Sequence, residues 1–115
     1  MKTELARRCY YMHQWAYKDE QVRAMFMEQQ DRQEVVRVAI EAFGGHLQQF
    51  YFCFGEFDGV AISDYPDNET AVASLMSIFG QGRLRAVKTT VLISPDEMIK
   101  AIQLTRKTIL DKKQE

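Results

Sequence analysis

The chain has few of the residues that cross-link proteins or bind metals: its 115 residues include two cysteines, two histidines and two prolines. Cys9 and Cys53 lie far apart, with no C-x-x-C pair and no zinc-type spacing. We interpret both as buried free thiols, which are typical of a reducing compartment. The histidines, His13 and His46, have no acidic partner at ligand spacing. We therefore expect no metal and no cofactor.

The chain also has no large net charge of either sign and no apolar run long enough to span a membrane. Fifteen Lys and Arg residues nearly balance sixteen Asp and Glu residues, so no overall field attracts nucleic acid or anionic lipid. The longest uncharged stretch, residues 70–81, is too short to span a bilayer. The first eight residues, MKTELARR, lack the apolar region of a signal peptide. We predict a soluble cytoplasmic protein with no nucleic-acid partner and no membrane partner.

The pattern of breakers and apolar residues predicts one domain over residues 1–115, with its core at about 8–110. Gly44 and Gly45 end a helical region, Gly55 marks a tight turn, and Ser94-Pro95-Asp96-Glu97 is a capping box that begins the last helix. A polar break before Asp31 divides the first helical region in two. We expect strands at about 8–15, 46–54, 59–65 and 84–93, and helices at about 19–43, 67–79 and 94–112.

This order of elements is β-α-β-β-α-β with an extra C-terminal helix. The β-α-β halves favour parallel neighbours with right-handed crossovers, and the central hairpin favours an antiparallel pair. Together they predict a ferredoxin-like α+β sandwich, with a four-stranded antiparallel sheet and helices on one face. The same order builds an RNA-recognition module, but the third strand, GVAISDY, is acidic and nearly free of aromatic residues, whereas such a module needs a basic and aromatic signature there.

Large side chains occupy both alternating sets of the predicted strands. One set contains Tyr10, Met12, Phe50, Phe52 and Phe54, and the other contains Tyr11, His13, Trp15, Leu47 and Tyr51. Helices cover only one face of such a sheet, and an exposed face this aromatic is unusual for a monomer. We therefore expect a homodimer or higher oligomer that packs sheet to sheet.

Several separated motifs carry a resemblance to a known family. They are Phe50-Tyr51, Phe54-Gly55-Glu56-Phe57-Asp58, Val60, Ile62, Pro66-Asp67, Ala71 and Lys88-Thr89-Thr90, with Asp31-Arg32 and Gly44-Gly45 before them. From about Tyr10 to Ile102 the chain resembles the GYD domain family, whose Gly-x-Tyr/Phe-Asp signature corresponds here to Gly55, Phe57 and Asp58. The resemblance implies a subunit of the dimeric α/β-barrel group, whose ferredoxin-like subunits pair through their sheets.

The candidates for chemistry are few. His13 is a candidate acid or base near neutral pH if its face lines a pocket, and Tyr11 and Tyr51 are further catalytic candidates. Trp15 and Lys88 are candidates for binding an apolar or anionic ligand. For Asp58, a structural role as an acceptor of backbone N–H groups at the turn is favoured.

Two functional hypotheses remain open. The first is a homo-oligomeric module that binds a small apolar or anionic ligand or organises an assembly, favoured because no nucleophile or paired-carboxylate motif occurs. The alternative is a small cofactor-independent enzyme, a monooxygenase or an isomerase, with its pocket at the dimer interface. Convergence of Tyr11, His13 and Tyr51 on one cavity would favour the enzyme.

Overall fold

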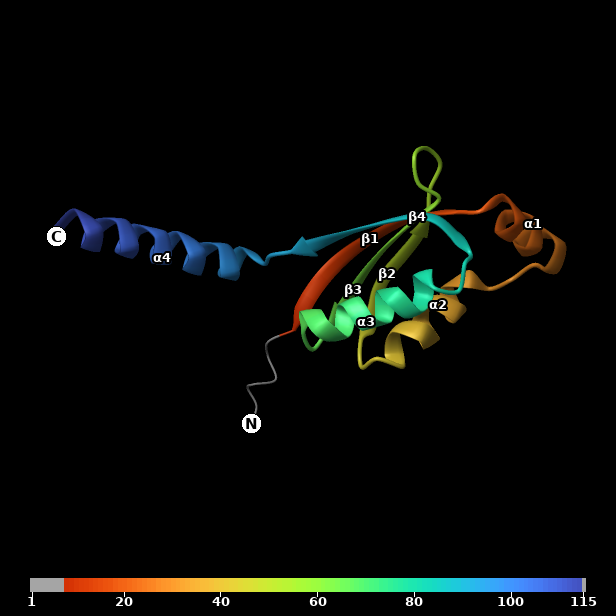
Figure 1. Cartoon of the computed structure of the whole chain (residues 1–115), viewed down its shortest axis with the longest axis horizontal. Coiled ribbons are helices and arrows are strands. Elements are labelled where there is room, and N and C mark those ends of the chain that lie inside the picture. The colour runs from red at the N-terminus through yellow and green to blue at the C-terminus, as the bar shows by residue number, and fades with distance from the viewer. Residues whose placement is uncertain (1–7, 115) are drawn as a thin grey trace.

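The computed structural model of the protein describes residues 8–114 (Figure 1). The prediction that the first eight residues do not form a signal peptide concerns, apart from Arg8, residues that lie outside this range. The elements are β1 (Cys9–Tyr17), α1 (Asp19–Glu28), α2 (Arg32–Glu41), β2 (His46–Phe52), β3 (Gly59–Tyr65), α3 (Asn68–Phe79), β4 (Leu84–Leu92) and α4 (Pro95–Gln114). The predicted α+β fold, a ferredoxin-like four-stranded sheet with an extra C-terminal helix, is confirmed. No helix among residues 8–114 combines the length and apolarity needed to cross a membrane.

The sheet has the strand order β2-β3-β1-β4, and every neighbouring pair is antiparallel. The expectation of parallel neighbours within each β-α-β half is therefore wrong. β1 and β2 do run parallel, but β3 lies between them, and β1 likewise separates β3 from β4. Each crossover passes over an intervening strand, which is why two parallel halves yield a fully antiparallel sheet.

Local signals set the ends of the helices. Gln29 has a left-handed backbone (φ 51°) and ends α1, and the Asp31 carboxylate accepts the Glu34 N–H to begin α2. The predicted break between the two helices is therefore confirmed. Gly44 (φ 77°) follows α2, and Asp67 caps α3 by accepting the Thr70 N–H at 2.8 Å. Helices α2 and α3 lie side by side against one face of the sheet (Figure 1).

The loop after β2 ties the hairpin to β1. Gly55 has φ 138°, as expected of a glycine that makes a tight turn. The Asp58 carboxylate accepts the Tyr17 N–H at 2.9 Å, and the Asp58 N–H donates to the Trp15 carbonyl at 2.8 Å. Asp58 thus accepts a backbone N–H as predicted, although its partner lies at the end of β1 and not within the hairpin.

The two faces of the sheet have different environments. Odd-numbered residues of β1 point toward α2 and α3, and Tyr11, His13, Trp15 and Tyr17 are all buried. A bulge between Leu47 and Gln49 changes the alternation in β2, so Phe50 pairs with Ala61 on the helix side, whereas Tyr51 pairs with Val60 on the open side. The predicted grouping of Tyr51 with Tyr11, and of Phe50 and Phe52 with Tyr10, is therefore wrong.

The buried side of α3 also differs from the prediction. Ala71 and Leu75 face the sheet as expected, but Met76 and Phe79 are exposed. Ser74 and Ile78 take their places, and the Ser74 hydroxyl pairs with the Tyr65 hydroxyl at 2.7 Å. A buried serine is stable here because its polar group has a partner.

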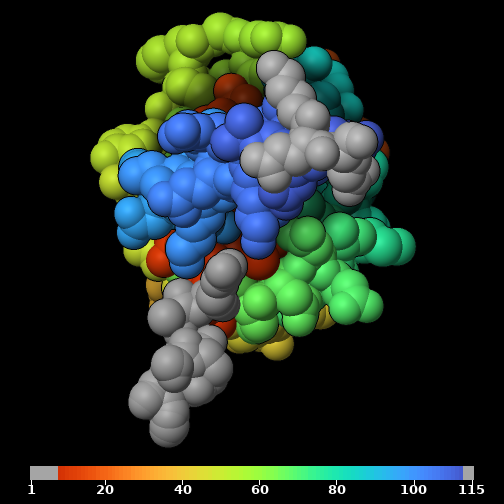
Figure 2. Space-filling view, turned by 90° about the vertical axis from the view of Figure 1, so that its left-hand side faces the viewer, coloured from red at the N-terminus to blue at the C-terminus, as the bar shows by residue number. Residues whose placement is uncertain are grey.

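The last helix leaves the body of the protein. Ser94 and Glu97 exchange the two hydrogen bonds of the predicted capping box, and α4 then extends away from the sheet (Figure 1) and toward the viewer in Figure 2. Every residue from Pro95 to Lys112 is exposed. The radius of gyration is 18.3 Å, whereas a compact chain of this length has about 13 Å.

Candidate functional site

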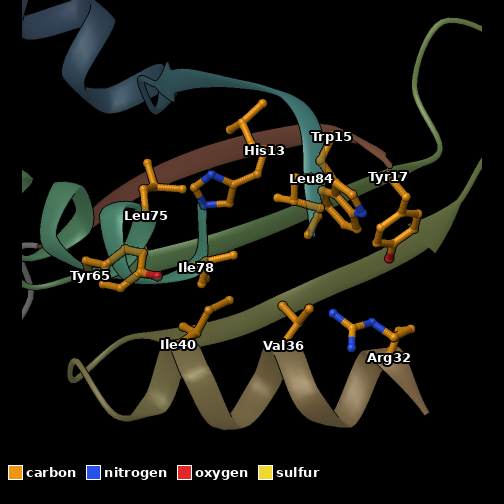
Figure 3. Close-up of a pocket in the computed structure, with 12 residues that line it drawn as sticks. His13, Trp15, Tyr17, Arg32, Val36, Ile40, Tyr65, Leu75, Ile78 and Leu84 are labelled. Atoms are coloured by element: carbon orange, nitrogen blue, oxygen red, sulfur yellow. The ribbon is translucent and has the colours of Figure 1, made fainter. Parts of the chain in front are cut away.

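A cavity of about 60 Å³ lies between the helix-covered face of the sheet and the helices α2 and α3 (Figure 3). It lies inside one chain, on the opposite side of the sheet from the open face. The residues that line it are His13, Trp15, Tyr17, Ala61, Tyr65, Leu84 and Val87 from the sheet, and Arg32, Val36, Ile40, Leu75 and Ile78 from the helices.

Secondary-structure periods position this lining. In β1 every second residue faces the same side, which brings His13, Trp15 and Tyr17 to the cavity. In α2 the residues Arg32 and Val36 lie four positions apart, as do Val36 and Ile40, so they form one stripe along the helix. The stripe carries the charged residue at the start of α2 and the apolar residues toward its end.

The His13 side of the cavity is polar but fully paired. The His13 Nε2 lies 2.6 Å from the Ser63 hydroxyl, and its Nδ1 lies 3.0 Å from the Thr89 hydroxyl. Burial lowers the pKa of His13 from 6.5 to about 4. The imidazole is therefore neutral at pH 7, with one nitrogen protonated and both nitrogens held by hydroxyl groups.

Aromatic rings form the wall next to this histidine. The Trp15 ring stacks over Gly59, where an added Cβ would lie 2.3 Å from Trp15 Cζ2. The Phe50 ring packs against the same indole, with ring centroids 5.4 Å apart. Because Trp15 is the only tryptophan in the chain, tryptophan fluorescence comes from this wall of the cavity.

Comparison with known proteins identifies the family. The GYD domain family matches residues 11–102. The chain belongs to the GYD domain family. A search of curated proteins returned no match.

A solved structure titled MtbAldR shares the fold of this GYD domain, with a TM-score of 0.58 and 16% sequence identity. The alignment covers 75% of the present chain and 52% of the MtbAldR chain. The GYD domain thus spans about half the length of that structure, and the likeness shows the fold alone.

The GYD domain does not bring the five sequence candidates together. His13 and Trp15 line the cavity. Tyr11 is buried beside it among core residues, where its hydroxyl donates to Asn68 Oδ1 and burial, first among the causes, raises its pKa to about 12. Tyr51 and Lys88 are exposed on the open face, on the two edge strands β2 and β4.

The cavity and near-cavity residues that were absent from the sequence candidates include Tyr17, Arg32, Ser63 and Thr89. Arg32 had a readable signal, because it continues the apolar spacing of Val36 and Ile40 and so places a charge on a buried stripe. Ser63 and Thr89 had none, since only the pairing of β1 with β3 and β4 sets them across from His13 and its neighbours.

A second polar cluster lies on the open side of the sheet. Asp64 is buried and accepts hydrogen bonds from Arg8, His46 and Gln48. Burial acts to raise the pKa of Asp64, but these hydrogen bonds and the Arg8 charge hold it below its usual value. The cluster is internally paired, so we assign it to holding β1 and β2 onto β3. Within residues 8–114, no group of three or more His, Cys, Asp and Glu side chains is arranged to hold a metal ion.

Proposed function

We propose that this GYD domain is a homo-oligomeric module that binds a small, mainly apolar ligand in the cavity between the sheet and helices α2 and α3. The observation that carries the proposal is the cavity itself, which aliphatic and aromatic side chains line along most of its length. Pockets of this kind, apolar with a few placed polar groups, are typical of small-molecule sites.

The volume limits the ligand. A cavity of about 60 Å³ is smaller than the roughly 150 Å³ engineered cavity that binds benzene. It suits a short aliphatic chain with one polar group. The paired His13 supplies a fixed polar wall, with one donor and one acceptor already engaged by hydroxyls.

Trp15 fluorescence and thermal unfolding test this binding directly. Short-chain alcohols, amides and carboxylates serve as probes, and a bound probe raises the unfolding temperature by mass action. Ala61 lines the cavity, so A61V should weaken binding by filling it. The matched change A73V, on the exposed side of α3, should leave binding unchanged. If no class of probe binds the wild-type protein, the proposal of a small-ligand module fails.

Two apolar surfaces, the open face of the sheet and one side of α4, support the proposal of a homo-oligomer. The open face exposes Tyr10 by 42% and Tyr51 by 61%, next to the half-buried Met12, Ile62 and Leu92. An isolated helix gains little stability in water without packing, and α4 carries an apolar stripe that no part of the described chain covers. It consists of Met98, Ile99, Ile102, Ile109 and Leu110. A second copy of the chain offers the same two apolar surfaces and covers both at once.

Light scattering combined with size exclusion measures the assembly. We expect a mass of at least twice the 13.4 kDa of one chain at micromolar concentration. Y51K, on the open face, should shift the protein toward the monomer. The control V38K places the same charge on an exposed position of α2 and should leave the mass unchanged. A monomeric wild-type protein would refute the oligomer while leaving the cavity proposal to its own test.

The enzyme hypothesis has less support from the geometry. It needs Tyr11, His13 and Tyr51 at one cavity, but Tyr51 lies on the other face of the sheet. The pKa of His13 is about 4 and that of Tyr11 about 12, so neither group exchanges protons readily near pH 7. We therefore place the binding module first.

A further inference from the structure

The end of the cavity opposite His13 holds two buried polar atoms without a partner. They are the Tyr17 hydroxyl and the Arg32 Nε, the two side-chain atoms among residues 8–112 that are buried and make no hydrogen bond. Tyr17 is 4% exposed and Arg32 is 8% exposed. Buried polar groups nearly always have partners, so two exceptions in one cavity point to a group that binds there.

Arg32 also lacks a countercharge. Its Nη1 donates to the neutral Gln30 amide oxygen at 3.3 Å, and no carboxylate of the described chain forms an ion pair with it. Two other arginines show the usual arrangement, because Arg8 pairs with Asp64 and Arg37 pairs with Glu34 and Glu41. A guanidinium is protonated at all ordinary pH values, and a buried charge without an opposite charge is costly.

Two different elements aim these groups at the same space. Tyr17 ends β1 and Arg32 begins α2. The Arg32 Cζ lies over the Tyr17 ring, 6.0 Å from its centroid, so the ring gives the guanidinium a cation–π contact but no countercharge. Figure 3 shows the Tyr17 hydroxyl directed toward the helix and the Arg32 guanidinium directed inward from it. Gln30, itself hydrogen-bonded by Gln21 at 3.1 Å, fixes the other side of the guanidinium. The Nε–H and the phenol O–H are both donors.

Beyond this end the cavity is apolar. Val36, Ile40, Leu75 and Ile78 supply the helix side, and Trp15 lines the sheet side with its indole ring. His13, farther along the cavity, already has two hydroxyl partners. A ligand that satisfies this arrangement carries one anionic acceptor group and a short apolar body.

We propose that Arg32 and Tyr17 bind the carboxylate of a short-chain aliphatic acid, and that its alkyl chain occupies the apolar part of the cavity. The inference rests on the proposed small-ligand function and specifies its ligand class. Arginine pairs with carboxylates through charge-assisted hydrogen bonds, and the Tyr17 hydroxyl adds a donor to the Arg32 Nε–H. The roughly 60 Å³ of space limits the alkyl chain to a few carbons.

Isosteric probes separate the charge from the shape. Butyrate and butyramide differ in charge but scarcely in size, so Trp15 fluorescence titrations at constant ionic strength compare them directly. We expect wild-type protein to bind butyrate at least about tenfold more tightly than butyramide. Inorganic phosphate should bind more weakly than butyrate, because it has no alkyl chain. Equal binding of butyrate and butyramide, or tighter binding of phosphate, would overturn the assignment while leaving the small-ligand function in place.

Variants assign the preference to the named residues. R32Q keeps polar atoms but removes the charge, so it should abolish the preference for butyrate while still binding butyramide. Y17F should weaken the binding of butyrate several-fold and have little effect on the binding of butyramide. R37Q is the control on α2, since Arg37 pairs with surface glutamates, and it should retain the full preference. An undiminished preference in R32Q would refute the role of Arg32.

A measurement on wild-type protein covers the case in which R32Q fails to fold. The Arg32 Nε–H signal in nitrogen-15 NMR spectra should move on addition of butyrate and stay in place on addition of butyramide. A signal that ignores butyrate although Trp15 fluorescence changes would show that the acid binds elsewhere in the cavity, and would refute the proposed carboxylate site. If neither probe changes either signal, the proposed carboxylate site is refuted, and the alcohol probes then decide the small-ligand function.

Discussion

Tyr10 and Tyr11 are neighbours in one strand, yet Tyr11 is 3% exposed and Tyr10 is 42% exposed. The difference between them is the difference between the two faces of the sheet. Helices α2 and α3 cover the face of Tyr11 and enclose the cavity, whereas no helix of residues 8–114 covers the face of Tyr10 (Figure 1). Folding of one chain therefore completes one face only, and the two faces can be tested separately.

The largest expected effect comes from truncating the covered tyrosine. Y11A removes a buried ring and leaves Asn68 without its hydroxyl partner, so it should lower the free energy of unfolding by about 4 kcal/mol. Y10A should cost less than about 1 kcal/mol in dilute, monomeric protein. Equilibrium denaturation by urea measures both.

Measuring Y10A and Y11A at several protein concentrations makes the comparison between the two faces more specific. If a second copy covers the open face, the cost of Y10A should grow as concentration rises, whereas the cost of Y11A should stay constant. Equal costs for the two variants in dilute protein would contradict the distinction between the faces.

Acid should destabilise the covered face through His13. Its pKa is about 4 in the folded protein against 6.5 for an ordinary histidine, so the unfolded chain binds a proton first as pH falls. Stability should therefore be constant above about pH 6.5, decrease from there to about pH 4, and lose about 3 kcal/mol in total.

The variant H13Q has no imidazole to protonate and should not show this decrease. Asp64 does not obscure it, because its lowered pKa places its own titration below the usual 3.8. Denaturation curves at several pH values give the result. A wild-type profile that is flat between pH 6.5 and 4 would show that His13 is accessible to protons in the folded state.

Gly59 offers a smaller test of packing on the covered face. In G59A the new Cβ overlaps the Trp15 ring, so we expect a loss of about 2 kcal/mol and a changed Trp15 fluorescence spectrum. G55A, in the hairpin loop, adds a methyl group where nothing lies within 4 Å. It should cost about 1 kcal/mol through its positive φ alone, with the Trp15 spectrum unchanged.

The sequence predicted the helix ends and the order of the elements along the chain because these depend on short-range signals. Asp31, Gly44, Asp67 and Ser94 each act within a few residues of their own position. The face that Phe50, Tyr51 and Phe52 occupy was predicted wrongly, because one extra residue at the bulge after Leu47 reverses every later side chain.

The cavity was only partly predictable for the same reason. His13 and Trp15 were recognisable as aromatic strand residues, but the two hydrogen-bond partners of His13 lie 50 and 76 positions along the chain. Arg32 belongs to a local pattern, since it continues a helical stripe. Its lack of a countercharge, however, is a property of the folded arrangement that no spacing in the sequence expresses.

Helix α4 and the sheet should differ in their local stability against unfolding. Its 20 residues form a rod about 30 Å long that rests on no other element, so in a free monomer its amide hydrogens should exchange with solvent at nearly the rate of an isolated peptide. Those of β1, which pairs with strands on both sides, should exchange only when the whole sheet unfolds. A partner that packs on α4 would slow the exchange of that helix by orders of magnitude and leave β1 nearly unchanged, so the C-terminal amides record association independently of the fold.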